Sequence, residues 1–254
     1  MKFARFKAEG HEYYGLVEGQ TVRVIEGNIY DNYTLTDRSY PVSEVKLLPP
    51  VKPTKVIGVG LNYKAVAQAK GVEFPAEPVL FLKPPSSVIG PGDSILIPPA
   101  VKNPAFEVEL AVIIGKQAKN VSADSAFDYV LGYCLANDVT AKDHMIKGKP
   151  WTKGKSFDTF TPMGPYVVTD IDPDDTVISV SVNGEQKQLS NTSDMIFNVR
   201  ELIAFISGVM TLEPGDVILT GTPPGGGNFN IGDVIKLSGP QLGEMVNDVR
   251  VYGI

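Results

Sequence analysis

Cysteine and histidine are scarce in this sequence. Among its 254 residues there is one cysteine, Cys134, and there are two histidines, His11 and His144. A single cysteine excludes a disulfide within the chain, a zinc ribbon and a Cys-x-x-Cys redox site. Two histidines cannot supply a three-histidine zinc site. Any catalysis by histidine must therefore use His11 or His144.

Long hydrophobic runs and an excess of positive charge are also absent. No apolar stretch approaches the ~20 residues of a membrane-spanning helix, and the start of the chain alternates apolar and basic residues, unlike a signal peptide. The chain has 23 Lys and Arg residues against 29 Asp and Glu residues, a net charge of −6. This balance argues against nucleic-acid or anionic-membrane partners, and we expect a cytoplasmic protein.

Glycine and proline are abundant, with 25 and 20 residues, and favour many short strands and turns. Residues 1–48 are expected to form a small N-terminal β domain with strands at 2–7, 13–17 and 21–25. A stiff proline-rich connector at 48–53 marks the boundary. The larger catalytic domain then covers 49–254.

Strands also predominate in the second part. The strongest is 106–115, and the others are expected at 55–59, 79–82, 94–97, 130–135, 166–169, 177–182, 217–219 and 234–237. Helices are expected at 64–70, 122–129 and 194–210. Because strands and helices do not alternate regularly, a doubly wound parallel sheet is disfavoured. The pattern favours an α+β, β-rich roll or barrel with a few packed helices.

Two glutamates interrupt the strongest apolar strand. Glu107 and Glu109 are alternate residues, so they should project from one face of the strand, ~6.6 Å apart at Cα. Two like charges on an apolar strand require either a wet face or a neutralising cation. The pattern therefore allows a solvated edge strand or half of a divalent-metal site. Asp138 follows strand 130–135, where the sequence becomes polar, and it is either an ordinary turn residue or a third carboxylate of the metal site. A site of three carboxylates offers only oxygen ligands, which suits Mg²⁺ or Mn²⁺.

Two loops could contact a substrate. Lys155 follows a glycine in a polar segment, and it is either a surface residue or a cation for a substrate oxyanion. The segment 220–227 directly follows a strand and is either a plain turn or a carboxylate-binding loop. The segment 58–63 (GVGLNY) lacks the third glycine of a dinucleotide fingerprint, and we do not expect nucleotide binding.

Seven stretches match one family in order along the chain. They are GVGLNY (58–63), FLKPPSS (81–87), FEVELAVIIG (106–115), GYCLANDVTAKD (132–143), GKSFDTFTPMGP (154–165), VNGE (182–185) and MTLEPGDVILTGTPPG (210–225). With these stretches the sequence resembles the fumarylacetoacetate hydrolase family, in particular its short prokaryotic-type members. Such members act on 2-oxo acids and hydroxymuconate-type diacids.

The resemblance implies a mixed-β roll, a homodimer and one Mg²⁺ or Mn²⁺ ion. The metal ligands would be Glu107, Glu109 and Asp138. Lys155 would be the catalytic lysine, because it adds positive charge where the negative charge of an enolate develops. The substrate would be a small carboxylic acid, with contacts from Thr222, Gly221, Asn62 and Lys142.

The sequence departs from the family at the pair that activates water. A helix after Asn-Tyr usually carries His and, three residues later, Glu, but here these positions are Val66 and Ala69. Neither side chain can accept a proton. His144 could substitute from another direction, or it could be a loop histidine.

We therefore expect a metal-dependent enzyme that isomerises, tautomerises or decarboxylates a small 2-oxo acid or 2-hydroxy-enoic diacid through an enolate. The alternatives are a hydrolase that cleaves a C–C bond in acylpyruvate-type substrates and a family member that binds metal and ligand without turnover.

Overall fold

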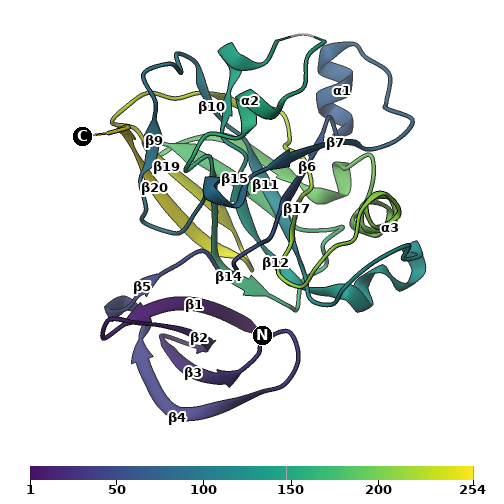
Figure 1. Cartoon of the computed structure of the whole chain (residues 1–254). Helices are drawn as coiled ribbons and strands as arrows, with labels where there is room; N and C mark the ends of the chain where they lie inside the picture. Colours follow the sequence, from purple (N-terminus) through teal and green to yellow (C-terminus); the bar gives the residue numbers. More distant parts are fainter. Residues whose placement is uncertain (147, 254) are drawn as a thin grey trace.

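Three β-sheets with a few short helices form the described part of the chain in the computed structural model (Figure 1). The structure describes residues 1–146 and 148–253, so residue 254, the last of the expected catalytic domain, lies outside it. The β-rich α+β class with mixed sheets is confirmed. No helix within these two ranges is both long and apolar enough to cross a membrane.

The N-terminal strands form the lower lobe in Figure 1 and surround a small apolar cluster of their own, which includes Phe6 and Val22. Strand β1 also pairs with β14 of the larger lobe, so one sheet runs through both. The exposed, polar strand β4 escaped the sequence analysis because little of it faces a core. The elements of this lobe are β1 (Lys2–Ala8), β2 (His11–Glu18), β3 (Thr21–Gly27), β4 (Tyr33–Pro41), η1 (Val42–Glu44) and β5 (Lys46–Leu47).

The main sheet has the strand order β4-β3-β2-β1-β14-β12-β11-β17-β6-β7, with β5 and β8 attached to its sides. Strand β11 lies near its centre and every one of its residues is buried, which explains its apolar run. The remaining strands of this sheet are β6 (Val56–Gly60), β7 (Val79–Lys83), β8 (Val88–Ile89), β11 (Val108–Ile114), β12 (Val130–Asn137), β14 (Thr161–Val168) and β17 (Val217–Leu219).

Two smaller sheets complete the roll. The five-stranded sheet has the order β16-β15-β19-β20-β9, and the three-stranded sheet has the order β13-β10-β18. A hairpin turn joins β15 to β16, where Asn183 and Gly184 have φ of 51° and 83°, positive at both positions as a type I′ turn requires. The strands are β9 (Ile95–Ile97), β10 (Pro104–Phe106), β13 (Thr140–Ala141), β15 (Val177–Val182), β16 (Glu185–Asn191), β18 (Gly227–Asn228), β19 (Val234–Gly239) and β20 (Gly243–Val251).

Helix 64–70 is confirmed as α1, but the helix expected over 194–210 begins too early. Helix α3 starts at Val199, because Asn198 and Glu201 form a capping box there. The short α2 replaces an expected loop and lies with α1 at the upper end of Figure 1. The helices are α1 (Lys64–Lys70), α2 (Thr152–Lys155), α3 (Val199–Val209), η2 (Pro85–Ser87), η3 (Ala123–Tyr129), η4 (Lys142–His144) and η5 (Thr192–Asp194).

The strand expected over 106–115 is also wrong in one respect, because it is broken at Glu107. Strand β10 ends at Phe106 in the three-stranded sheet, and β11 begins at Val108 in the main sheet. The side chain of Asn137 accepts a hydrogen bond from the Glu107 N–H (2.9 Å), so it replaces the missing strand partner at the break.

Candidate metal centre

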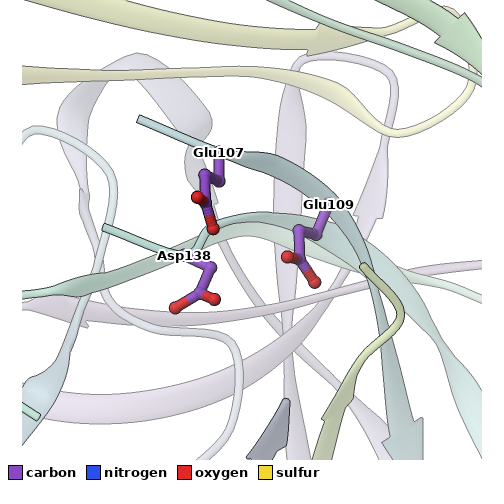
Figure 2. A group of neighbouring side chains, drawn as sticks. All are labelled: Glu107, Glu109 and Asp138. Atoms are coloured by element: carbon purple, nitrogen blue, oxygen red, sulfur yellow. The ribbon is translucent and has the colours of Figure 1, made fainter. Parts of the chain in front are cut away.

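Glu107, Glu109 and Asp138 converge where the chain passes from one sheet to the next (Figure 2). Each offers one carboxylate oxygen, and these oxygens all lie within 4.8 Å of one another. Strands β11 and β12 are antiparallel and place Val108 opposite Asn137, so Asp138 follows directly beside Glu107. The Asp138 N–H donates to the Glu107 carbonyl (2.8 Å), which fixes the two backbones together.

Two buried lysines approach the same carboxylates. Lys155, at the end of α2, donates to the Glu107 carboxylate (2.7 Å) and also to Asp138. Lys83, the last residue of β7, donates to Asp138 Oδ1 (2.5 Å) and to the Val139 carbonyl (3.3 Å). The sequence analysis missed Lys83, because a lysine at the end of a strand before two prolines is typical of an exposed position.

The three carboxylates differ in how far neighbouring positive charges compensate them. Burial alone would raise the pKa of Asp138, but the ammonium groups of Lys155 and Lys83 hold that pKa below its ordinary value. Burial, reinforced by the charge of Asp138, raises the pKa of Glu109 well above its ordinary value. The hydrogen bond that Glu109 accepts comes from the Gly221 N–H (2.7 Å).

This imbalance fits a divalent cation. Three carboxylates face two lysines, and Glu109 is not within salt-bridge distance of either. A cation beside Glu109 would compensate its buried charge. Carboxylate oxygens without histidine or cysteine suit a hard ion such as Mg²⁺ or Mn²⁺. The residues present therefore fit the metal that the sequence predicts.

Thr222 lies beside Glu107, Glu109 and Asp138, called the carboxylate cluster below, and two hydrogen bonds hold its side chain in place. Its hydroxyl donates to the Val108 carbonyl (2.9 Å) and accepts from the Gln188 amide (3.0 Å). Gln188, which is buried in β16, also accepts from the Val108 N–H (3.0 Å). Gln188 therefore links the five-stranded sheet to Val108, which lies between Glu107 and Glu109. The polar composition of β16 gave no indication of this role.

The cluster opens into a pocket of about 230 Å³. Phe81 and Trp151 form part of its wall and contact each other edge to face, with ring centroids 5.5 Å apart. Gly60 permits this arrangement, because a Cβ atom there would lie 2.2 Å from the Trp151 ring. The other lining residues are Val59, Leu61, Val66, Lys70, Glu107, Glu109, Asp138, Thr140, Lys142, Met145, Lys155 and Thr222.

Asn62 and Gly221 lie outside the lining of this pocket. The Asn62 amide donates to the Phe197 and Thr220 carbonyls (3.0 and 2.8 Å) and accepts from the Phe197 N–H (2.9 Å). The Gly221 N–H is used by Glu109. Both residues support the loop that carries Thr222, and their contact with a substrate stays a prediction.

Comparison with known proteins decides the family. Residues 55–250 match the family described as fumarylacetoacetate (FAA) hydrolase C-terminal, and residues 1–50 match Rv2993c-like, N-terminal. The chain belongs to the fumarylacetoacetate hydrolase family. The resemblance found in the seven sequence stretches is thereby confirmed.

Named relatives of this family member include enzymes of three kinds. The mitochondrial oxaloacetate tautomerase Fahd2a of Rattus norvegicus is 46% identical over 82% of this chain and 71% of that protein. A crystal structure of 2-hydroxyhepta-2,4-diene-1,7-dioate isomerase from Mycobacterium marinum has a TM-score of 0.93 and 39% identity, and covers all of both chains. Maleylpyruvate hydrolase from Sphingobium sp. SYK-6, solved with manganese(II) and pyruvate, has a TM-score of 0.81 and 30% identity, and covers 99% of each chain.

Helix α1, called the lid helix below, carries Val66 and Ala69 where the family resemblance implies His and Glu. Val66 of α1 lines the pocket, whereas Ala69 is exposed and lies outside the lining. His144 does not replace the missing histidine here. Its ring lies within 3.0 Å of the Ala100 carbonyl and packs against Phe157, and it is not among the lining residues.

Proposed function

We propose that this chain is a divalent-metal-dependent enzyme that converts a small 2-oxo acid, or a 2-hydroxy-enoic diacid, through an enolate. Isomerisation, tautomerisation or decarboxylation is favoured over hydrolysis. The observation that carries the proposal is the convergence of three carboxylates, two buried and one half-buried, beside Lys155 in a pocket whose lid helix presents Val66. The named tautomerase and isomerase among the relatives support it.

Glu107, Glu109 and Asp138 would hold Mg²⁺ or Mn²⁺. When bound, such an ion supplies Lewis-acid polarisation of substrate oxygens. Lys83 donates to Oδ1 of Asp138, and Lys155 donates to Oδ2, so a different lysine fixes each oxygen of this carboxylate. The manganese(II) in the maleylpyruvate hydrolase structure supports this assignment.

Lys155 is the group that would stabilise the enolate oxygen. Burial alone would lower the pKa of Lys155, but the charges of Asp138, Glu107 and Glu109 raise it above its ordinary value. The amine therefore stays protonated at neutral pH and can donate to an oxygen on which negative charge develops. Its position 4.9 Å from the Phe81 ring centroid keeps it at the pocket wall.

Thr222 would bind the substrate carboxylate. Its hydroxyl proton is directed to the Val108 carbonyl, so binding a carboxylate requires the hydroxyl to turn. Gln188 holds the Thr222 oxygen during that rotation.

Hydrolysis requires a base that takes a proton from water. Of the lining residues on α1, Val66 has no proton-accepting group, and Lys70 is a cationic residue. Hydrolysis of acylpyruvates is therefore expected at background. We also propose a homodimer, for which the open edge of strand β7 at the end of the main sheet, with Leu82 exposed, offers a contact surface.

The test measures the disappearance of enol-oxaloacetate, and of related 2-oxo acids, with and without Mg²⁺ or Mn²⁺. Glu109→Ala should reduce the metal-dependent rate by more than about 100-fold, which exceeds the 10–100-fold typical of residues around a metal site. Glu77→Ala, an exposed glutamate outside the pocket, is the matched control. A rate that needs no metal, or no turnover across the panel, would contradict the proposed function.

A further inference from the structure

We propose that Lys70 determines substrate specificity by binding, together with Lys142, a second carboxylate at the far end of the substrate. The inference rests on the proposed function, because it places the 2-oxo acid end of the substrate at the carboxylate cluster. It goes further in assigning Lys70 the selection of dicarboxylic over monocarboxylic 2-oxo acids.

The pocket has a buried floor and an exposed rim. Glu109, Asp138 and Lys155 form the floor and are 2%, 1% and 4% exposed. Lys70 and Lys142 line the same pocket but are exposed. A ligand anchored at the floor by one end would therefore reach the part of the pocket that these two lysines line.

Helix α1 directs Lys70 toward the pocket. Lys70 is the last residue of the helix, four residues after Val66, and residues four apart lie on one helix face. Both line the pocket. Lys64 of the same helix is turned elsewhere, because its ammonium donates to the Ser193 carbonyl (3.3 Å) and it lines a different hollow. The lid thus presents a cation at the site instead of a base.

The two rim lysines lack a counter-charge within residues 1–146 and 148–253. The acidic residues that line the pocket are Glu107, Glu109 and Asp138. Their ion pairs are with Lys83 and Lys155, not with Lys70 or Lys142. Asp143, next to Lys142 in sequence, accepts hydrogen bonds from the Lys102 and Asn103 N–H groups. A ligand carboxylate would therefore supply the missing negative charge.

The walls of the pocket between its floor and its rim indicate the chemistry of the middle part of the ligand. They are largely apolar and include Val66, Phe81, Met145 and Trp151. Such walls suit a short carbon chain rather than a polar linker, because a polar group there would lose its hydrogen bonds to water. The expected ligand has a 2-oxo acid at one end, a short apolar chain and a carboxylate at the other end.

The test compares ligands that differ in the distal carboxylate alone. We would titrate the Mn²⁺-loaded protein by calorimetry with 2-oxoglutarate and 2-oxopentanoate, and with the longer pair 2-oxoadipate and 2-oxohexanoate. In at least one pair the diacid should bind more tightly. Lys70→Met should weaken that diacid about tenfold, the effect expected for one hydrogen bond between charged groups. It should leave the matched monoacid unchanged, and the effect should decrease as salt is added.

Lys64→Met is the control, because it removes a lysine from the same helix but from outside the pocket. If the unmodified protein binds none of these acids, the proposed function itself is wrong. If it binds them and Lys70→Met leaves every ratio of diacid to monoacid affinity unchanged, the role of Lys70 is wrong while the proposed function stands. Unchanged binding of the monoacids shows that the variant is folded.

Discussion

Asp138 forms ion pairs with two lysines that come from different elements of the fold. Lys155 comes from the short helix α2, and Lys83 comes from the edge strand β7. Removing one partner of a buried ion pair leaves an uncompensated charge, which is far more unfavourable than the pair itself is favourable. The lysines therefore keep Asp138 ionised in a buried position, as a metal ligand must be.

Gln188 offers a sharp test of how the glutamates are positioned. Gln188→Leu would leave the buried Val108 N–H unpaired and would free the Thr222 hydroxyl on one side. We expect Mn²⁺ affinity to fall 10–100-fold, as is typical when a partner behind a metal site is removed. Gln186→Leu, on the same strand but exposed, should leave the affinity unchanged. Equal affinities for both variants in a Mn²⁺ titration would argue against the positioning role.

The sequence revealed some of these residues and not others for a physical reason. Glu107 and Glu109 stand out because a carboxylate within an apolar strand is anomalous without a cation. Lys83 and Gln188 occur where lysine and glutamine are common, at a strand end and in a polar strand. Their burial depends on packing between sheets, which periodicity does not describe.

The lid helix α1 is the element on which the type of reaction depends. Val66→His places an imidazole on the pocket wall, and Ala69→Glu adds the carboxylate that accompanies it in the family pattern. The double variant should gain Mn²⁺-dependent acylpyruvate hydrolysis at least tenfold over background, a modest part of the ~10²–10⁴-fold that acid–base catalysis contributes.

Ala69→Glu alone is the control for this gain. Ala69 is exposed and outside the pocket lining, so the single variant should remain at background. If the double variant also stays at background, then the His and Glu pair alone does not decide whether the enzyme hydrolyses acylpyruvates.

Element boundaries were predictable where a local signal sets them. The helix 64–70 and the strand 217–219 follow directly from composition and apolar pattern. The break at Glu107 was not predictable, because apolar residues continue at alternate positions on both sides of it while the chain changes sheets. Glu107, at this break, is one of the three carboxylates, so an interruption in secondary structure lies within the candidate site.

At the scale of the whole molecule, the site lies where the three sheets meet. The main sheet contributes Glu109 and Lys83, and the five-stranded sheet contributes Gln188. Glu107 joins the main sheet to the three-stranded sheet, and the loop after β17 contributes Thr222. Such long-range contacts are invisible to local pattern. The class of fold could be predicted from the excess of strands, but the order of the strands in the three sheets could not.

The central claim is that Glu107, Glu109 and Asp138 bind one divalent ion. A crystal structure grown with Mn²⁺ and oxalate, a mimic of the enolate, tests it most directly through the anomalous signal of manganese. The account predicts one manganese peak per chain within coordination distance of all three carboxylates, with oxalate on its open side facing Lys155. A peak elsewhere, or three carboxylates that do not share one ion, would contradict it.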